Sequence, residues 1–168
     1  RLSGYKFLKF YFNFLRKYKN SKIFLIDPSK KKSVNNKLLI NKLGIKNNKI
    51  FSFVAPLYNP NNLNDKNLLK HISKFKPNVI LLNIGGGTQE VLGSYLKSKL
   101  KFKCKIICTG AAISFFTKDQ APINDFIDKF YLGWLIRIIF NPLQFYKRYF
   151  YALKLINIVK NSNCKIIK

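Results

Sequence analysis

The sequence predicts an α/β fold: a Rossmann-like parallel sheet with helices on both faces, followed by a C-terminal, helical, basic appendage. Two observations favour this fold class. Short apolar segments alternate with amphipathic ones from residue 5 to residue 109. The apolar segments are also continuous, as expected for strands of a sheet that is covered on both faces. With 168 residues, of which 48% are hydrophobic, the chain is long enough to bury a core and is not mainly disordered.

Four strands are predicted where a short apolar run ends at a proline, a glycine or a polar residue. They cover residues 22–26, 49–55, 78–84 and 103–109. Four helices are predicted where apolar residues recur every three or four positions, at residues 5–19, 33–43, 62–75 and 89–100. Gly44 would end the second helix, and Asn64 or Asp65 would cap the third. Ligands of such folds bind at the carboxyl ends of the strands, so the loops at these ends are the informative ones.

The character of the sequence changes near residue 122. Residues 126–160 are long, aromatic and basic, and no strand alternates with them. We therefore predict a sheet domain over residues 1–121 and a helical, membrane-associating appendage over residues 122–168. Its most apolar stretch, residues 131–143, is interrupted by Arg137 and Pro142 and does not predict a membrane-spanning helix. A basic helix that carries aromatics is typical of a membrane surface with anionic lipids.

The net charge of the chain is +26, from 32 basic and 6 acidic residues. This charge predicts affinity for polyanions, namely nucleic acid, anionic membrane or nucleotides. Only four of the basic residues are arginines, the side chain best suited to grip phosphate, so part of the charge is attributed to a general bias toward lysine. No nucleic-acid motif accompanies the charge, and we expect no specific nucleic-acid partner. The three cysteines do not form a disulfide framework, which favours a reducing cytoplasm.

The segment Gly85-Gly86-Gly87-Thr88-Gln89-Glu90 lies between the most apolar strand and a helix. Glycines allow a ligand to approach the backbone closely, and the start of a helix favours a phosphate or diphosphate. In this interpretation Thr88 caps the helix and Gln89 points toward the ligand. The alternative is a tight turn before a capped helix that binds nothing. Gly110-Ala111-Ala112-Ile113-Ser114 follows the next strand, and either close ligand approach or a simple turn accounts for its small residues.

Other candidate groups are weaker. Asp27 ends the first strand; a cap of the next helix is favoured over contact with a ribose hydroxyl. His71 has no histidine or cysteine near it in sequence and is interpreted as structural. Cys104 and Cys108 share a strand about 13 Å apart, too far for one metal or a disulfide. The chain has no Asp-x-Asp pair. No metal site and no cofactor are predicted.

Several segments, taken in order, form a larger pattern. They are Arg1-x-x-Gly4; Gly87-Thr88-Gln89-Glu90; Gly110-Ala111 with Phe115 and Ala121-Pro122; and Leu132-x-Trp134-x-x-Arg137 with Pro142 and Arg148-Tyr149. The pattern resembles the WecG/TagA/CpsF family of bacterial glycosyltransferases over nearly the whole chain. In that family the corresponding segments read Arg-Val-x-Gly, Gly-x-Pro-x-Gln-Glu, Gly-Val-Gly-Ala…Phe-Asp-Phe…Arg-Ala-Pro and Leu-Glu-Trp-Leu-x-Arg…Glu-Pro…Arg-Tyr.

The resemblance implies a function. The family moves N-acetylmannosamine-type sugars from a UDP-sugar donor to a polyprenyl-diphosphate-linked sugar acceptor, in teichoic acid, common antigen or capsule synthesis. It implies an inverting, metal-independent reaction on the inner face of the plasma membrane, with possible homo-oligomers. The general base of the family is an Asp that precedes the Arg-Val-x-Gly segment, so the chain is expected to be N-terminally truncated and incomplete for activity.

The resemblance also implies roles for particular residues. Gln89, Arg137 and Arg148 would be catalytic, with the two arginines offsetting the charge of the leaving UDP. Substrate-binding residues would be Arg1, Gly86, Gly87, Thr88, Glu90, Gly110, Ala111 and Ser114.

The chain departs from the family pattern at four positions. The proline of Gly-x-Pro-x-Gln-Glu is missing. Ser114 replaces the aspartate of Phe-Asp-Phe, Gln120 an arginine, and Gly133 the glutamate before the tryptophan. These departures indicate a divergent branch with a different donor or acceptor. They leave two alternatives open: a catalytically inactive homologue that serves as a binding or scaffold module, and a basic nucleic-acid-binding protein.

Overall fold

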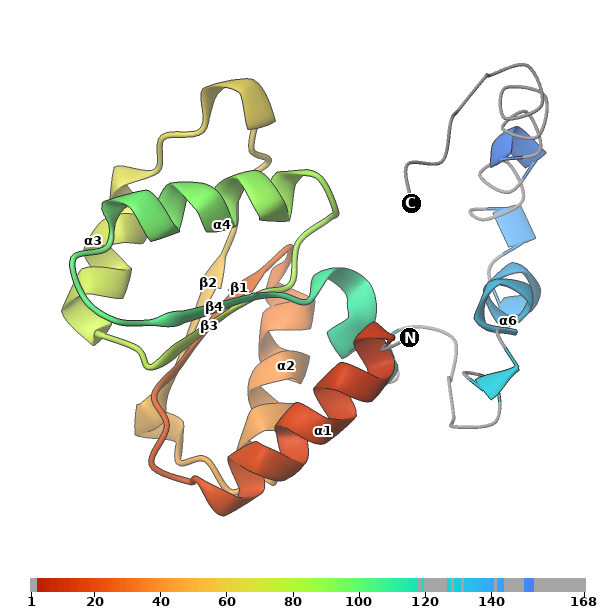
Figure 1. The fold of residues 1–168 in the computed structure, drawn as a ribbon, viewed down its shortest axis with the longest axis horizontal. Helices are drawn as coiled ribbons and strands as arrows, with labels where there is room; N and C mark the ends of the chain where they lie inside the picture. Colours follow the sequence, from red (N-terminus) through yellow and green to blue (C-terminus); the bar gives the residue numbers. More distant parts are fainter. Residues whose placement is uncertain are drawn as a thin grey trace, which may run out of the picture. The chain divides into compact units, whose positions relative to one another are not determined.

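The computed structural model describes residues 3–117, 119, 127, 129–130, 132–140, 142–143 and 150–152. The chain divides into two compact units, Arg1–Asp119 and Gln120–Lys168, and each is described by itself. Figure 1 shows the fold with its helices and strands labelled. The first unit contains the sheet and the loops that form the candidate site.

The first unit is built on a four-stranded sheet with the order β2-β1-β3-β4. The strands are β1 (Ile23–Asp27), β2 (Ile50–Val54), β3 (Val79–Leu82) and β4 (Lys105–Cys108). Every neighbouring pair is parallel; Ile23 of the central β1 lies opposite both Ile50 of β2 and Val79 of β3. The predicted strands are therefore present, each with slightly different bounds, and the α/β fold class is confirmed.

Helices cover both faces of this sheet (Figure 1). On one face lie α1 (Gly4–Lys17), α2 (Lys30–Lys42) and the 3-10 helix η3 (Gly110–Phe115). On the other lie α3 (Lys66–Phe75) and α4 (Thr88–Lys99). Two short 3-10 helices, η1 (Asn47–Lys49) and η2 (Pro60–Asn62), precede β2 and α3.

Two apolar cores hold the layers together, because successive side chains of a strand point to opposite faces. Ile23 and Leu25 of β1 pack under α1 and α2, whereas Phe24 and Ile26 pack under α3 and α4. β1 is buried at every position, which explains why its sequence shows no alternation of apolar and polar residues. His71 lies against the rings of Phe51 and Phe53, at 5.4 and 5.8 Å between ring centroids.

Capping residues set the helix boundaries. The cap of α2 differs from the prediction, whereas the cap of α3 is one of the two predicted residues. Ser29, rather than Asp27, caps α2 by accepting a hydrogen bond from the backbone N–H of Lys32, so this helix begins earlier than predicted. Asp65 caps α3 through the backbone N–H of Leu68 at 2.8 Å. The predicted third helix is thus divided, with η2 before Asp65 and α3 after it.

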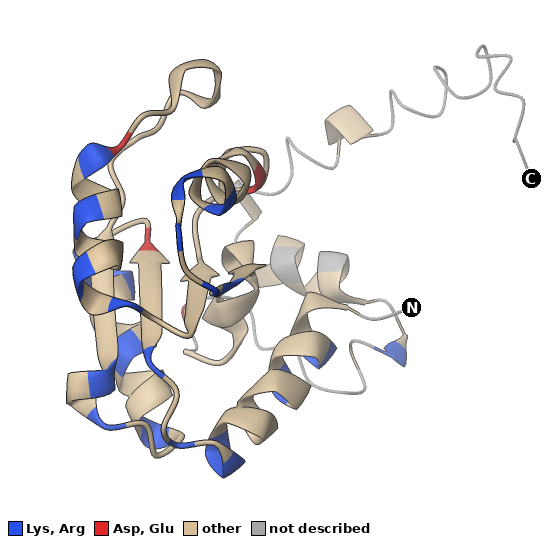
Figure 2. Ribbon diagram, turned by 60° about the vertical axis from the view of Figure 1, so that its left-hand side comes forward, with Lys and Arg blue, Asp and Glu red and all other residues tan. Residues whose placement is uncertain are grey.

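The second unit contains α6 (Gly133–Phe140) among its described residues. The rest of the helical appendage predicted over residues 122–168 lies largely outside the described residues, and the domain boundary at residues 121 and 122 stays a prediction. In the described part of the chain, no helix is both long and apolar enough to cross a membrane. Figure 2 shows lysines and arginines spread over several helices of the first unit, with few acidic residues among them.

The central position of β3 leads to a stability prediction. Leu81 is fully buried in the core under α1 and α2, so Leu81→Ala leaves a cavity and should lower the free energy of unfolding by about 2–5 kcal/mol. Leu38, on the exposed side of α2, is the matched control, and Leu38→Ala should change the value by less than about 0.5 kcal/mol. Urea unfolding measures both; equal losses would contradict the placement of β3.

Candidate active site

The order of the strands marks one edge of the sheet as the place for a ligand. From β1 the chain passes to β2 on one side, and then returns to β3 on the other side. At such a reversal the loops after the two strands diverge to opposite faces, and α/β folds bind ligands between them. We call this place the crevice. Here the diverging loops lead from β1 to α2 and from β3 to α4, the helices on opposite faces.

The floor of this crevice is a buried polar network centred on Asp27. The Asp27 side chain is fully buried, and its Oδ1 accepts hydrogen bonds from the Nδ2 atoms of Asn36 and Asn83 at 2.6 and 2.7 Å. Its Oδ2 accepts from the hydroxyl of Ser52 at 2.6 Å. Because a hydroxyl has one hydrogen, Ser33 must donate the further hydrogen bond that joins it to Ser52.

The network joins all four strands. Asn83 follows β3, Ser52 belongs to β2, and the hydroxyl of Thr109, just after β4, donates to the Oδ1 of Asn83. Burial raises the pKa of the Asp27 carboxyl above its ordinary value, and the three donated hydrogen bonds counteract part of that rise. Asp27 does not cap the helix that follows it, and its carboxylate is not exposed for contact with a ribose. It lies beneath the surface and holds the strands together.

The glycine-rich loop lies above this floor. A Cβ atom added at Gly85 or Gly86 would meet nothing within 4 Å, and both residues are exposed. Packing in the described part of the chain therefore gives no reason for glycine at these positions. Gly87 differs, because its φ of 85° is strained for other residues. Gly87 is also the N-cap of α4, so Thr88, predicted to be the cap, is instead the first residue of the helix.

The first turn of α4 brings three predicted site residues together. Gln89 is 8% exposed, and its Nε2 donates to the Glu90 Oε1 at 2.7 Å. The Gln89 amide lies against Gly110, where an added Cβ would stand 3.4 Å from Nε2 and 3.5 Å from Oε1. Gly110 has a φ of +53°, so its backbone also favours glycine. The loops after β3 and β4 therefore meet at this pair.

Gln89 carries a buried, unsatisfied acceptor. Its amide orientation is fixed, because Glu90 can only accept from Nε2, and its Oε1 then has no hydrogen-bond partner. A buried polar atom without a hydrogen-bond partner costs about 1–3 kcal/mol.

The carboxylate of Glu90 changes the electrostatics expected at this helix start. Its Oε2 accepts a hydrogen bond from the backbone N–H of Gly87 at 2.6 Å. The hydrogen bond from Gln89 also lowers the pKa of Glu90, so this carboxylate stays ionised. An ionised carboxylate at the helix start repels a phosphate and accepts hydrogen bonds from hydroxyl groups. As folded, this turn therefore suits a hydroxylated ligand better than the diphosphate predicted for it.

A basic group that sequence reasoning missed lies near Ser114. Ser114 is 3% exposed, and its Oγ accepts a hydrogen bond from the Nζ of Lys32 at 2.9 Å. Lys32 is the third lysine in the first turn of α2, after Lys30 and Lys31, and that turn has no acidic residue. Cations are unfavourable at a helix start, so these lysines make this side of the crevice positive at a cost in stability. In the sequence, the run of three consecutive lysines was the feature that could have indicated this basic group.

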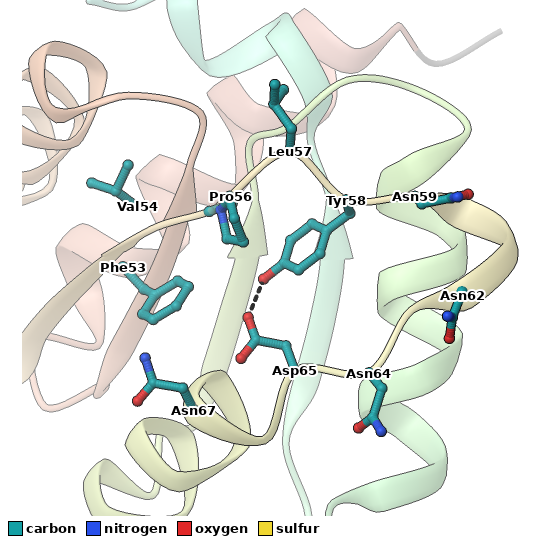
Figure 3. Close-up of a pocket in the computed structure, with 11 residues that line it drawn as sticks. Phe53, Val54, Pro56, Leu57, Tyr58, Asn59, Asn62, Asn64, Asp65 and Asn67 are labelled. Carbon is teal, nitrogen blue, oxygen red and sulfur yellow. Dashed lines mark hydrogen bonds between the residues drawn. The ribbon is translucent and has the colours of Figure 1, made fainter.

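A second hollow opens at the end of β2 and has a volume of about 660 Å³. Tyr58 and Asp65 face each other within it, and the Tyr58 hydroxyl donates to the Asp65 Oδ2 at 2.6 Å (Figure 3). Burial, with the nearby Asp65, raises the pKa of Tyr58, so the phenol stays protonated. The hydroxyl of Tyr95 on α4 donates to Asn64, which joins this wall to the helix that follows the glycine loop. Side-chain amides line the hollow at Asn59, Asn62, Asn64 and Asn67.

The remaining predicted site residues are placed only in part. Ala111 is exposed at the start of η3, and Thr88 is half-buried. The backbone of Arg137 belongs to α6, but its side chain lies outside the described residues, as do Arg1 and Arg148. Among the described residues, no group of histidine, cysteine or acidic side chains is arranged to hold a metal ion.

A comparison with protein families gives this geometry a context. The model of the WecG/TagA/CpsF glycosyl transferase family matches residues 1–163. The chain belongs to the WecG/TagA/CpsF family of glycosyl transferases. Comparisons with curated proteins and with solved structures gave no match. Membership in this family means a sugar donor and an acceptor, and the family match spans both the glycine loop and the crevice.

The polar network leads to a second prediction. Asp27→Ala leaves the donors of Asn36, Asn83 and Ser52 unpaired in the interior. We expect the free energy of unfolding to fall by roughly 3 kcal/mol. Asp27→Asn keeps one acceptor oxygen for the two asparagines and should cost less. Urea unfolding of both variants measures the difference, and an alanine variant as stable as the asparagine variant would argue against the network.

The raised pKa of Asp27 leads to a third prediction. A folded-state pKa above the unfolded value contributes stability that is fully present below the unfolded pKa and is lost as the pH rises through the folded pKa. The free energy of unfolding of the parent, minus that of Asp27→Asn, should therefore increase as the pH falls from neutrality toward about 3.9. Subtraction cancels the other titrating groups. A difference that stays constant or decreases in urea unfolding would exclude a raised pKa.

Proposed function

We propose that the chain transfers an N-acetylmannosamine-type sugar from a UDP-sugar to a polyprenyl-diphosphate-linked sugar, with inversion and without a metal ion. The observation that carries the proposal is the meeting of Gln89 and Gly110 beside the crevice, in a chain that belongs to a glycosyltransferase family. The open Gly85–Gly86 backbone next to this pair supports a ligand in close approach.

In this proposal, the first turn of α4 binds the sugar of the donor. Glu90 is an ionised acceptor, and Gln89 has a carbonyl oxygen without a donor, so both suit sugar hydroxyl and amide groups. Gly110 lies against this amide without a side chain, so a small shift of its backbone would help a ligand reach the Gln89 oxygen. Discrimination between sugars would then depend on which hydroxyl reaches Gln89.

The diphosphate of the donor then lies toward the basic side of the crevice. Lys32 is held at 2.9 Å by the buried Ser114, and Lys30 and Lys31 add positive charge in the same helical turn. Fixed positive groups of this kind stabilise the charge that develops on a leaving UDP. Arg137 and Arg148 are proposed to add to this charge, as the family resemblance implies. The amide-lined hollow at Tyr58 is a candidate place for another part of the donor or the acceptor.

The reaction forms one bond and breaks one. The acceptor hydroxyl oxygen attacks the anomeric carbon, the bond from that carbon to the UDP oxygen breaks, and UDP leaves with the electron pair. The hydroxyl proton passes to a general base. Glu90 is unsuited to this task because its pKa is lowered, and Asp27 because it is buried. The proposal therefore assigns the general base to neither of them.

The acceptor in this proposal is lipid-linked, so the reaction takes place on the inner face of the plasma membrane, as part of cell-surface polysaccharide synthesis. The positive charge of the chain supports attraction to that anionic surface. The homo-oligomer that the family resemblance implies stays a prediction. The ionised carboxylate of Glu90 repels a phosphate backbone, which favours transfer over nucleic-acid binding.

The fourth prediction concerns the two parts of the proposed site, with the sugar at the first turn of α4 and the diphosphate beside Lys32. Calorimetric titration tests it. Gln89→Ala should weaken binding of a UDP-linked N-acetylhexosamine by about tenfold, the loss of one good hydrogen bond, and leave UDP binding nearly unchanged. Lys32→Gln should weaken both ligands, because it acts on the diphosphate. Lys97→Gln, an exposed lysine at the far end of α4, removes the same charge and serves as the matched control.

Inorganic pyrophosphate separates a built site from bulk charge in the same titrations. If pyrophosphate binds as tightly as UDP, and Lys97→Gln weakens both as much as Lys32→Gln does, the crevice is only a positive surface. If Gln89→Ala weakens UDP and the UDP-sugar equally, the first turn of α4 does not recognise the sugar. Unfolding midpoints of each variant show whether the fold has survived the substitution.

A further inference from the structure

The outer face of α1 carries aromatic side chains where a helix on a soluble surface carries polar ones. Phe10 is 75% exposed and Phe14 is 37% exposed. The side chains that α1 buries are Leu8, Tyr11, Phe12 and Leu15, and Tyr18, just after the helix, is also 58% exposed.

Helical geometry places basic residues on the same face. Successive residues of a helix are about 100° apart around its axis. Lys6 therefore lies about 40° to one side of Phe10, and Phe14 lies about 40° to the other side. Lys17 lies about 20° from Phe10. Lys6 and Lys17 are exposed, and α1 contains no acidic residue. We call this surface, made of Lys6, Phe10, Phe14 and Lys17, the α1 face.

The neighbouring edge strand extends the same chemistry. Lys105, at the start of β4, has its Nζ 5.8 Å from the centre of the Phe14 ring. The Phe14 ring also lies 4.3 Å from the Tyr18 ring, so these two aromatic side chains are in contact. Lys101 and Lys103, which precede β4, are exposed as well. Apolar rings flanked by lysines without acidic neighbours are complementary to an anionic lipid surface.

We propose that the α1 face inserts Phe10 and Phe14 into the interface of an anionic membrane, with Lys6, Lys17 and Lys105 against the lipid headgroups. The face belongs to the sheet unit, so this contact is separate from the membrane role predicted for residues 122–168. This inference deepens the proposed function, which requires a lipid-linked acceptor. Its evidence, however, comes from the exposed residues of the α1 face. A second copy of the chain is the less favoured occupant, because two chains of charge +26 repel each other.

Vesicle cosedimentation of the full chain tests the proposal and is the fifth prediction. The vesicles contain phosphatidylcholine with or without phosphatidylglycerol, and no sugar donor is present, so the result is independent of any transfer assay. Phe10→Ser with Phe14→Ser should weaken binding to the anionic vesicles by about tenfold at unchanged net charge. Leu57→Ser, at a fully exposed leucine in the loop after β2, is the matched control and should have no effect.

The charge contribution is tested with a matched pair of variants. Lys6→Gln with Lys17→Gln should weaken binding to anionic vesicles by about tenfold. Lys70→Gln with Lys97→Gln removes the same charge from exposed positions on α3 and α4, and should weaken binding much less. Equal losses for the two pairs would show attraction by bulk charge and would overturn the proposal.

Tryptophan emission gives a direct readout that does not depend on loss of binding. Phe10→Trp adds an indole to a chain whose one native tryptophan is Trp134, and subtraction of the parent spectrum isolates its emission. Anionic vesicles should shift this emission to the blue, and Leu57→Trp should show no such shift. An emission that does not move, or that is already blue-shifted without vesicles because the face is covered within the protein, would refute membrane contact.

Two further outcomes name other occupants and would overturn the proposal. If Phe10→Ser with Phe14→Ser abolishes self-association in sedimentation velocity and leaves vesicle binding unchanged, the face joins two copies. If the same variant weakens RNA binding alone, its partner is nucleic acid. The Phe10→Trp arm keeps the test valid if the serine variant fails to fold, because it retains an aromatic side chain at an exposed position.

Discussion

The arrangement of the crevice depends on one buried carboxylate. Parallel strands end at one edge of the sheet, where their last side chains would otherwise leave polar groups without partners. Asp27 accepts three hydrogen bonds at that edge, from α2, from β2 and from the residue after β3, and Asn83 extends the network to Thr109 after β4. Because the donors come from four different elements, a shift of one strand end would unpair a buried group. The glycine loop therefore begins from a fixed point, and Gln89 meets Gly110 at a defined position.

Most of the fold could be predicted from apolar periodicity alone. β1 and β3 are buried at every position, and such strands give continuous apolar runs that few other structures produce. Boundaries were less predictable because they depend on single hydrogen bonds: Ser29 starts α2 ahead of the expected position, and Asp65 starts α3 after η2. Helical periodicity places Phe10 and Phe14 on the side of Lys6 and Lys17, but it does not show whether another element covers that side.

The candidate site was predictable at the level of loops and not of interactions. The pattern of glycines after two strands indicated Gln89 and Gly110, and the folded chain brings them together. It gave no sign that Glu90 would turn back onto the N–H of Gly87, which reverses the sign of the charge at the helix start. Likewise the partners of Asp27 lie 9, 25 and 56 residues away in sequence, so only the sheet order reveals them. The contact between Lys32 and Ser114 spans 82 residues and is equally invisible to local pattern.

These charges explain why a chain of net charge +26 need not bind its ligands by charge alone. A uniform positive surface attracts any polyanion and cannot distinguish one nucleotide from another. At the crevice, however, a carboxylate and an amide at the start of α4 lie on one side, and lysines at the start of α2 lie on the other. A ligand with hydroxyl groups at one end and phosphates at the other matches this polarity in a single orientation. An inorganic anion or a nucleic-acid backbone matches only half of it. Orientation of the ligand, rather than strength of attraction, is then what the crevice adds to the general charge of the surface.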